Sequence, residues 1–307
     1  MNTNPSTVAV LGPGGVGGLA AALLARAGHR VVCLAGPDTT QALRTEGLTV
    51  RSNRFGDFTV PVKADTQLRD QVDVCLVAVK ETALSTALNR VDPRVLGSGL
   101  VVPLLNGIDH LPPLRARYRA ERVIAATIKV ESTKVAPGRI EHTSPFAAIE
   151  LAVPVAPAAR AGLDHLAVLL EGAGFSVSLR RDETAMLWDK LCFLAPMALL
   201  TTRYGATVGD VRARCRPELL TLIREITSVA RAAGGPVDAA RILAMFDQAP
   251  AAMKSSMQRD AEAGRPLELD AIGGSVLRAA EAHGVETPTL AQIVTELGAD
   301  LRGKAAR

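Results

Sequence analysis

The first half of the chain alternates short, continuously apolar runs with stretches in which apolar residues recur at helical spacing. Such runs predict strands buried on both faces, as in a parallel sheet. They lie at residues 7–11, 30–34, 73–79, 100–105 and 123–130. The segment 19–27 predicts a helix that ends before Gly28. Strands that alternate with helices in this way favour a doubly wound, mostly parallel sheet.

Two later segments, 140–151 and 175–179, are expected to be partly antiparallel strands of the same domain, with a helix at 158–172 between them. The pattern changes near residue 181, because no β-type alternation follows it. Helices are expected at 183–200, 217–233, 239–246, 269–283 and 289–301. The sequence therefore predicts an α/β domain over residues 1–181 and an all-helical domain over residues 182–307.

The composition suits this division and narrows the function. Hydrophobic residues make up 48% of the chain and aromatic residues only 3%, which favours helices packed closely on a parallel sheet. Lys and Arg number 35 against 31 Asp and Glu, and the small excess is spread along the chain. Without a basic run, the sequence gives no sign of nucleic-acid binding.

The cysteines and the apolar runs indicate the cellular compartment in which the protein is expected. The chain has four cysteines, with no CxxC pair and no His/Cys cluster of metal-ligand spacing, so we expect no metal and a reduced, cytoplasmic setting. The first residues lack the basic and apolar pattern of a signal peptide. The apolar run 191–200 is too short to span a bilayer, so no membrane segment is expected.

A glycine-rich turn follows the first predicted strand. It reads Gly-Pro-Gly-Gly-Val-Gly and fits the pattern G-x-G-x-x-G. In a strand–turn–helix setting the first glycine permits the tight turn, the second lets a pyrophosphate approach the backbone, and the third lets helix and strand pack closely. The fold class is therefore a Rossmann-like doubly wound sheet that binds a dinucleotide. The residues expected to hold it in the turn are Gly12, Gly14, Gly15, Val16 and Gly17.

The end of the second strand should distinguish NAD from NADP, since an acidic residue there binds the ribose hydroxyls and an Arg favours the 2′-phosphate. Here the chain reads Leu-Ala-Gly-Pro-Asp, with neither residue type in the usual place. Asp38 lies slightly late, and Arg44 is within reach in sequence. Either residue could equally be a solvated loop or helix residue.

Three later segments place polar residues where a core does not need them. Lys80 and Asn106 follow buried strands at their carboxyl ends, the edge at which open α/β sheets bind ligands. Lys190 lies in an apolar helix beside Trp188, the only tryptophan. Removal from water there would disfavour its ammonium form and make it a better proton donor near neutral pH. The alternative for Lys190 is a surface lysine whose stem lies along apolar side chains.

Taken together and in this order, these motifs resemble the ketopantoate reductase family over essentially the whole chain. The similarity continues in a C-terminal block, Ser-Ser-Met at 255–257 followed by Leu-Glu-Leu-Asp at 267–270. The combination of the glycine turn, Lys80, Asn106, Lys190, Ser256 and Glu268 is far more specific than any of its parts.

The resemblance implies an NAD(P)H-dependent reductase of a 2-keto acid or related ketone, with NADP as cofactor and NAD as the alternative. The catalytic residues would be Lys190, the general acid that protonates the ketone oxygen, and Glu268, which holds the lysine and contacts substrate. Asn106 would orient the nicotinamide or the substrate, and Lys80 would lie along the cofactor. Ser256 would reach the substrate carboxylate.

The sequence also departs from the family pattern. Asparagines that the family often places four and eight residues after the lysine, and five after the glutamate, are Leu194, Ala198 and Gly273 here. The Arg that commonly follows the second strand is absent around Gly36. We therefore expect a less polar substrate site and a weaker preference for NADPH.

Two alternatives remain at this level. One keeps the fold and the lysine but changes the substrate, to an imine or a bulkier apolar ketone. The other is a non-catalytic NAD(P) sensor, which the pairing of Lys190 with Glu268 disfavours because a sensor needs no proton donor. A small-molecule substrate is expected in the leading interpretation, and a homodimer is compatible with the sequence, which does not fix the oligomeric state.

Overall fold

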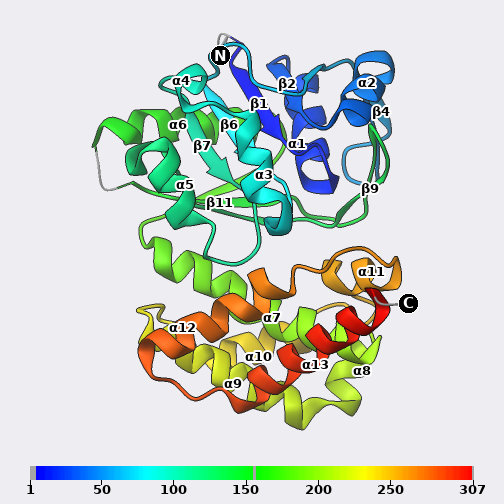
Figure 1. Ribbon diagram of the computed structural model, residues 1–307, viewed down its shortest axis with the longest axis vertical. Coiled ribbons are helices and arrows are strands. Elements are labelled where there is room, and N and C mark those ends of the chain that lie inside the picture. The colour runs from blue at the N-terminus through cyan, green and yellow to red at the C-terminus, as the bar shows by residue number, and fades with distance from the viewer. Residues whose placement is uncertain (1–4, 155–156, 306–307) are drawn as a thin grey trace. The chain divides into compact units, whose positions relative to one another are not determined.

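The computed structural model describes residues 5–154 and 157–305, and contacts divide the chain into two compact units (Figure 1). The first unit comprises Met1–Leu105 and His110–Glu183, and the second comprises Asn106–Asp109 and Thr184–Arg307. The division after Glu183 lies two residues beyond the position chosen from sequence. The assignment of 106–109 to the second unit was not anticipated.

The first unit is built on a five-stranded parallel sheet in the order β5-β2-β1-β6-β7. Its strands are β1 (Thr7–Leu11), β2 (Arg30–Leu34), β5 (Lys63–Asp65), β6 (Val74–Val77) and β7 (Leu100–Pro103). The predicted strands 73–79 and 100–105 are each shorter than expected, and β5 was missed. The order reverses between β1 and β6, and open α/β sheets bind ligands at the carboxyl ends of the strands beside such a switch point.

A second group of strands continues beyond β7, where an isolated parallel bridge joins Val101 to Val123. It has the order β12-β11-β8, with β8 (Ala126–Lys129) antiparallel and β12 (Ser176–Arg180) parallel to β11 (Ala148–Ala152). The partly antiparallel arrangement expected for the late strands is therefore present.

A third sheet, of order β4-β3-β10-β9, corrects one expectation. Its strands are β3 (Leu48–Ser52), β4 (Phe58–Val60), β9 (Ser132–Ala136) and β10 (Arg139–His142). The predicted strand 140–151 is wrong as a single element, because its start belongs to β10 and its end to β11 in another sheet. Pro145 lies in the connection, where its missing N–H cannot serve a ladder.

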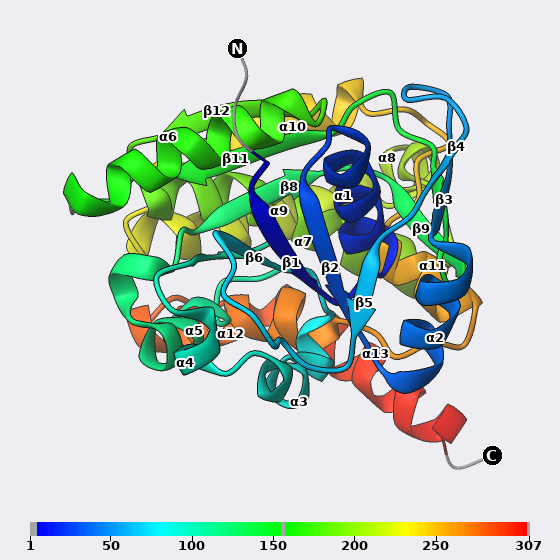
Figure 2. The same cartoon turned by 90° about the horizontal axis from the view of Figure 1, so that it is seen from above.

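Helices lie on both faces of the parallel sheet. The core joins one face of β1 and β2 to the apolar sides of α1 (Gly15–Arg26) and α6 (Pro157–Gly172). Figure 2 shows α1 on one side of these strands and the short helix α3 (Leu84–Ala87) on the other. The α1 helix begins four residues before the predicted start, at the glycine turn itself. The other elements are α2 (Pro37–Glu46), α4 (Pro93–Leu96), α5 (Leu111–Tyr118), η1 (Glu81–Ala83), η2 (Leu88–Arg90) and η3 (Ala120–Arg122).

Over its described residues, the second unit has helices as its only regular secondary structure, as expected. Its helices are α7 (Glu183–Tyr204), α8 (Val208–Arg214), α9 (Arg216–Ala232), α10 (Ala239–Gln248), α11 (Ser256–Glu262), α12 (Ser275–His283) and α13 (Pro288–Ala305). Of the helices in the described part of the chain, only α7 is long and apolar enough to cross a membrane, and 78% of its most apolar window is buried inside the protein. That burial is typical of a core helix.

The predicted helix 269–283 is interrupted at its start. Residues Asp270–Gly274 form a π-helical turn (η4), and α12 follows from Ser275. A π turn contains about one residue more than an α-helical turn, and the spacing of apolar residues along the sequence does not reveal this extra residue. Single π turns are frequent at functional sites, and this one begins two residues after Glu268.

Candidate active site

Three glycines of the glycine-rich turn are required by the packing of the first unit itself. Gly12 has φ +87°, and a Cβ there would lie 2.5 Å from Val79 Cγ1. A Cβ on Gly17 would lie 2.9 Å from Ala78 Cβ, so this glycine lets α1 pack against the end of β6. Gly15 lies against the backbone of Ser132, whose hydroxyl donates to the Gly15 carbonyl at 2.8 Å.

Gly14 is different, because the protein's own packing does not require it to be glycine. It is the N-cap of α1, and a Cβ there would meet nothing within 4 Å. The first turn of α1 carries no acidic side chain, so its N–H groups and positive dipole end are not neutralised by one. Val16, in the same turn, is half-buried. Open space above a helix N-terminus at a glycine fits a pyrophosphate, and the residues present therefore fit a dinucleotide.

Lys80 lies at the same edge of the sheet as the glycine turn. It follows β6, which pairs with β1 in parallel up to Leu11 opposite Val77. The N–H of Ala78 donates to the Leu11 carbonyl at 2.9 Å, which continues that register to the start of the turn. Lys80 is half-buried and precedes η1. The structure thus brings Lys80 to the edge where the sequence analysis placed it.

The end of β2 carries no charged side chain. Leu34 and Ala35 are buried, and Asp38 is exposed in the first turn of α2. Arg44, which the sequence places within reach of the end of the second strand, donates through Nε to the Ala64 carbonyl at 2.8 Å. Its Nη2 also lies 3.9 Å from Asp65 Oδ2. Asp65 was not anticipated from the sequence, since β5 is only three residues long.

The second unit links three of the predicted site residues by hydrogen bonds. Lys190 Nζ donates to Asn106 Oδ1 at 3.0 Å, and Asn106 Nδ2 donates to Glu268 Oε2 at 3.2 Å. Glu268 is 8% exposed, whereas Lys190 and Asn106 are half-buried. The amide therefore presents its oxygen to a cation and its nitrogen to an anion, which is the arrangement that satisfies both groups.

The segment that carries Asn106 is held against the π turn and the helix α12 that follows it. A Cβ on Gly107, which has φ +79°, would collide with the Ala271 carbonyl, so only glycine permits this approach. Two residues later, Asp109 accepts from Arg278 Nε at 2.8 Å. The same guanidinium bonds both carboxylate oxygens of Asp270, at 2.8 and 3.1 Å. These contacts fix the backbone from which the Asn106 side chain projects.

The positions that lack the family asparagines do not share one environment. Leu194 lies one helical turn after Lys190 on the same face of α7 and is half-buried. Ala198 is fully buried. Gly273 is buried in the π turn, and a Cβ there would lie 2.6 Å from Val294 Cγ2. Ala198 and Gly273 thus belong to the packed interior of the second unit, and Leu194 alone combines exposure with proximity to the lysine.

Ser256 is exposed at the first residue of α11. Its neighbour Ser255 is the buried N-cap, whose hydroxyl accepts from the Gln258 N–H at 3.0 Å and lies 2.8 Å from Thr201 Oγ1. The roles of the two serines are therefore divided: Ser255 caps the helix, and Ser256 is accessible. Ser256 is not part of the hydrogen bonds that join Lys190, Asn106 and Glu268.

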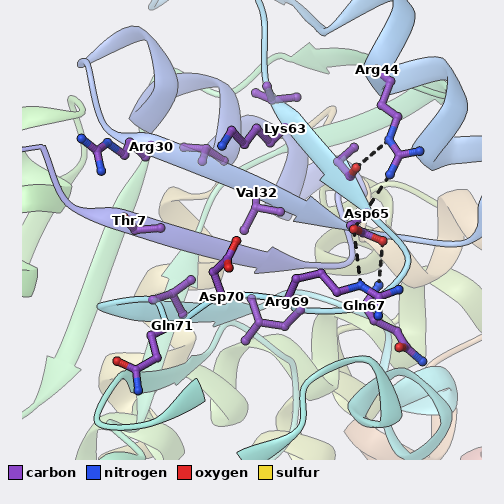
Figure 3. A pocket seen from close by; sticks show the side chains of 15 residues that line it. Thr7, Arg30, Val32, Arg44, Lys63, Asp65, Gln67, Arg69, Asp70 and Gln71 are labelled. Atoms are coloured by element: carbon purple, nitrogen blue, oxygen red, sulfur yellow. Dashed lines mark hydrogen bonds and ion pairs between the residues drawn. The ribbon is translucent and has the colours of Figure 1, made fainter. Parts of the chain in front are cut away.

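A hollow of about 660 Å³ lies on the face of the sheet opposite α1 (Figure 3). It exists because the connection from β5 to β6 crosses under β2 and β1 as a bare loop, without a helix. Its lining includes Thr7, Arg30, Val32, Arg44, Lys63, Asp65, Gln67, Arg69, Asp70 and Gln71. Thr7 and Arg30 mark the amino ends of the strands, and Asp65 marks a carboxyl end.

Neither a metal-binding group of side chains nor a reactive thiol among the three buried cysteines is found in the part of the chain that the structure describes. No group of three or more His, Cys, Asp or Glu residues there could hold a metal ion. Burial raises the pKa of Cys33, Cys75 and Cys192 to about 12, so these thiols stay protonated at neutral pH.

The parallel sheet with its glycine-rich turn and the helical second unit are typical of NAD(P)-dependent oxidoreductases. Comparison with known proteins agrees: the chain is an NAD(P)-dependent oxidoreductase acting on a carbonyl or alcohol group. The family model described as ketopantoate reductase PanE/ApbA matches residues 8–153, and its C-terminal companion matches residues 182–300. The chain therefore belongs to the ketopantoate reductase family, as the sequence motifs indicated.

Individual relatives match along nearly the full length. A 2-dehydropantoate 2-reductase of Caulobacter vibrioides is 30% identical over 96% of this chain and 99% of its own. The crystal structure of a PanE/ApbA family ketopantoate reductase from Ralstonia eutropha superimposes with a TM-score of 0.86 at 27% identity, covering 98% and 100% of the two chains. A D-mandelate dehydrogenase, solved with NADH and anilino(oxo)acetate, shares the fold with a TM-score of 0.89 at 20% identity, covering 97% and 99%.

Proposed function

We propose that this protein reduces the ketone of a small 2-keto acid, or of a related ketone, and that Lys190 is the general acid. The observation that carries the proposal is the hydrogen-bonded series Lys190–Asn106–Glu268 within the second unit. A lysine held by an amide that is itself held by a buried carboxylate has a fixed position for its ammonium group. Proton transfer to a reacting oxygen needs such positioning.

The roles of the chain's own groups follow from this geometry. When bound, the nicotinamide supplies hydride to the carbonyl carbon. Asn106 Oδ1 accepts one of the three N–H bonds of Lys190, and another can then donate to the substrate oxygen. As negative charge develops on that oxygen, the ammonium stabilises it and transfers a proton to it. Glu268 keeps the amide of Asn106 in the orientation that presents its oxygen to the lysine.

The cofactor of the proposal is NADPH, with NADH as the alternative. Gly12, Gly14, Gly15, Val16 and Gly17 would hold the pyrophosphate, and Lys80 would lie along the same edge. Family membership supports NADPH. The absence of a basic residue at the end of β2 supports a smaller preference for NADPH over NADH than relatives with that residue show. The D-mandelate dehydrogenase structure, which contains NADH, supports the compatibility of this fold with the unphosphorylated cofactor.

For the substrate, we propose that Ser256 binds the carboxylate and that Leu194 favours an apolar substituent beside the ketone. Without the family amide at position 194, the hydroxyl of ketopantoate would lose a partner, at a cost of roughly 1–3 kcal/mol for a polar group left unpaired. Ketopantoate is then reduced poorly, and a ketone with a bulkier apolar group is preferred. An aryl-substituted oxoacid of the kind bound in the D-mandelate dehydrogenase structure is a suitable test compound.

The central test replaces the lysine. Lys190→Ala should lower kcat by about 10²- to 10⁴-fold, the usual contribution of a positioned acid, while NADPH affinity changes little. Lys129→Ala, which removes a half-exposed lysine of the first unit, is the matched control and should retain full turnover. Near-normal kcat in a folded Lys190→Ala protein would remove this residue from the mechanism. Tight NADPH binding without turnover of any keto acid by the wild type would instead favour a sensor.

The substrate assignment is tested separately by kinetics on ketopantoate and an aryl oxoacid. Leu194→Asn should raise kcat/KM for ketopantoate relative to the aryl oxoacid by about tenfold, since it restores one hydrogen-bond partner. Leu194→Met keeps the apolar volume and should leave that ratio unchanged. A wild-type kcat/KM of about 10⁴ M⁻¹s⁻¹ or more on ketopantoate, within the ordinary enzyme range, would show that other groups replace the amide.

A further inference from the structure

The choice between the two cofactors cannot be made by β2 itself. It ends at the buried Leu34, and the next two residues are the buried Ala35 and a glycine. A Cβ on Gly36 would meet nothing within 4 Å, so the space beyond the strand is open. In this fold the adenosine ribose lies beside the end of that strand. The group that discriminates between a 2′-hydroxyl and a 2′-phosphate must therefore come from a neighbouring element.

That neighbour is β5, whose last residue is Asp65. Asp65 is the register partner of Leu34, and the N–H of Ala35 donates to the Asp65 carbonyl at 3.1 Å. Adjacent strands lie about 4.8 Å apart, so the Asp65 side chain starts one strand away from the end of β2. Its Oδ1 accepts from the N–H of Thr66 at 2.6 Å, which fixes the carboxylate against the following turn.

Two arginines from different elements converge on the other oxygen of this carboxylate (Figure 3). Arg44 Nη2 lies 3.9 Å and Arg69 Nε 3.7 Å from Asp65 Oδ2. The arginine side chains are 53% and 62% exposed, whereas that of Asp65 is 28% exposed. Each guanidinium has five N–H donors, and these long contacts leave most of them for another acceptor. The cluster therefore combines two accessible cations with one anchored anion, and its net charge is positive.

We propose that Asp65, Arg44 and Arg69 form the element that sets the choice between NADP(H) and NAD(H). Arg44 and Arg69 bind the 2′-phosphate, for which planar guanidinium groups are well suited. Asp65 works in the opposite direction: it repels the 2′-phosphate, holds both arginines, and accepts a hydrogen bond from the 2′-hydroxyl of NAD(H). This inference rests on the proposed function and explains how a chain without the usual arginine uses NADPH with reduced selectivity.

The electrostatic state of Asp65 agrees with this role. Partial burial acts to raise the pKa of Asp65. The N–H groups of Thr66 and Gln67 and the charges of Arg69 and Arg44 outweigh that effect and hold the pKa below its ordinary value. The carboxylate is therefore ionised throughout the neutral range, and a 2′-phosphate always meets its charge.

The test uses ligands that carry only the adenosine half of the cofactor, so that no turnover is involved. Isothermal titration calorimetry gives the dissociation constants of 2′,5′-ADP and 5′-AMP, and their ratio measures selectivity for the 2′-phosphate. Asp65→Asn keeps the shape and the Oδ1 acceptor while removing the charge. It should raise selectivity for 2′,5′-ADP about tenfold, equal to about 1.4 kcal/mol.

Matched controls come from the same hollow. Asp70→Asn removes an equal charge from the loop that follows β5 and should change the selectivity less than twofold. Arg44→Gln and Arg69→Gln should each lower selectivity about three- to tenfold, and Arg30→Gln, at the amino end of β2, should not. Unchanged melting temperatures show that the variants are folded.

The outcomes separate this inference from the proposed function. Opposite shifts for the Asp65 and arginine variants, with silent controls, support the assignment. If Asp65→Asn changes selectivity no more than Asp70→Asn, or if both arginine variants leave 2′,5′-ADP affinity unchanged, the cluster has no such role. If wild-type protein binds neither nucleotide and neither reduced cofactor, the cofactor site of the proposed function fails, and this inference fails with it.

Discussion

Replacing Asn106 by alanine tests whether its side-chain amide holds Lys190 and Glu268 in place in the second unit. The change removes the acceptor of Lys190 Nζ at 3.0 Å and the donor to Glu268 Oε2 at 3.2 Å. Hydrogen bonds to charged groups contribute about 1.5–3 kcal/mol each, so the two together set a ceiling of about 3–6 kcal/mol. Lys190 and Asn106 are half-exposed, and water recovers much of this. We expect a loss of about 1–2 kcal/mol in the free energy of unfolding.

The assay follows from the sequence. Trp188 is the only tryptophan, is 3% exposed, and precedes Lys190 by two residues in α7. Its fluorescence during urea denaturation reports on the unit that contains all three residues of the series. Asn106→Ala should lower the urea midpoint without changing the slope m. Asn89→Ala, which alters an exposed asparagine of the first unit, is the control and should leave the midpoint unchanged.

The kinetic effect should appear in kcat rather than in KM, because the amide positions the proton donor. We expect a decrease of about 10- to 100-fold, smaller than that of Lys190→Ala. A double-mutant cycle between the two positions should give a coupling energy within about 0.5–3 kcal/mol. Additive effects of the two substitutions, or an Asn106→Ala protein as stable and active as the Asn89 control, would refute the idea that the amide holds the lysine.

Two further predictions concern the first unit. Gly14→Val should abolish NADPH binding in calorimetry while the melting temperature stays within a few degrees, because a Cβ there meets only open space in the protein. Gly172→Val, which alters another open glycine at the end of α6, is the control and should bind NADPH normally. Normal binding by Gly14→Val would place the cofactor elsewhere. Burial, and then the charge of Arg54, lower the pKa of His142, and they outweigh the hydrogen bond that its Nε2 donates to the Phe146 carbonyl and the charge of Glu131, which act to raise it. The unfolded chain therefore takes up a proton near pH 6.5 before the folded one does, so stability should fall as pH drops below about 7 and level off below the folded pKa. His142→Asn should flatten this dependence, and an unchanged slope in urea titrations between pH 7 and 5 would contradict it.

The elements that the sequence predicted well are those whose apolar pattern follows directly from burial of their side chains. In β1 the continuous apolar run reflects burial from both faces, and in β2 it reflects the burial of Val31, Cys33 and Leu34. The helices of the second unit each pack an apolar side into one core. The missed strands β3 and β9 have exposed or half-buried positions and contain Thr, Ser, Arg and Lys. Such strands are held by pairing with distant partners, as β3 is with β10, and a local pattern does not record that pairing.

The sequence also named residues of the candidate site but did not predict the contacts between them. Asn106 was selected because it follows a buried strand, Lys190 because it lies in an apolar helix, and Glu268 by family resemblance. Nothing local predicted that one amide joins them. The hydrogen bonds of Asn106 reach residues 84 and 162 positions away. Arg44 was named from sequence only as a residue within reach of the end of the second strand, and its contact with Asp65 was not foreseen. A three-residue strand followed by a polar loop gives too short a pattern to place Asp65 in a sheet.

The structure also changes what the missing family asparagines mean for specificity. Ala198 and Gly273 lie in the interior of the second unit, and at Gly273 the space a side chain would need is taken by Val294. A single restored asparagine at position 273 would therefore overpack this core before it could bind a substrate. Leu194 has no such constraint, because it is half-buried and shares a face of α7 with Lys190. If the proposed substrate site is less polar than that of relatives, this depends on one accessible residue, Leu194, while the other two replacements are explained by packing within the second unit.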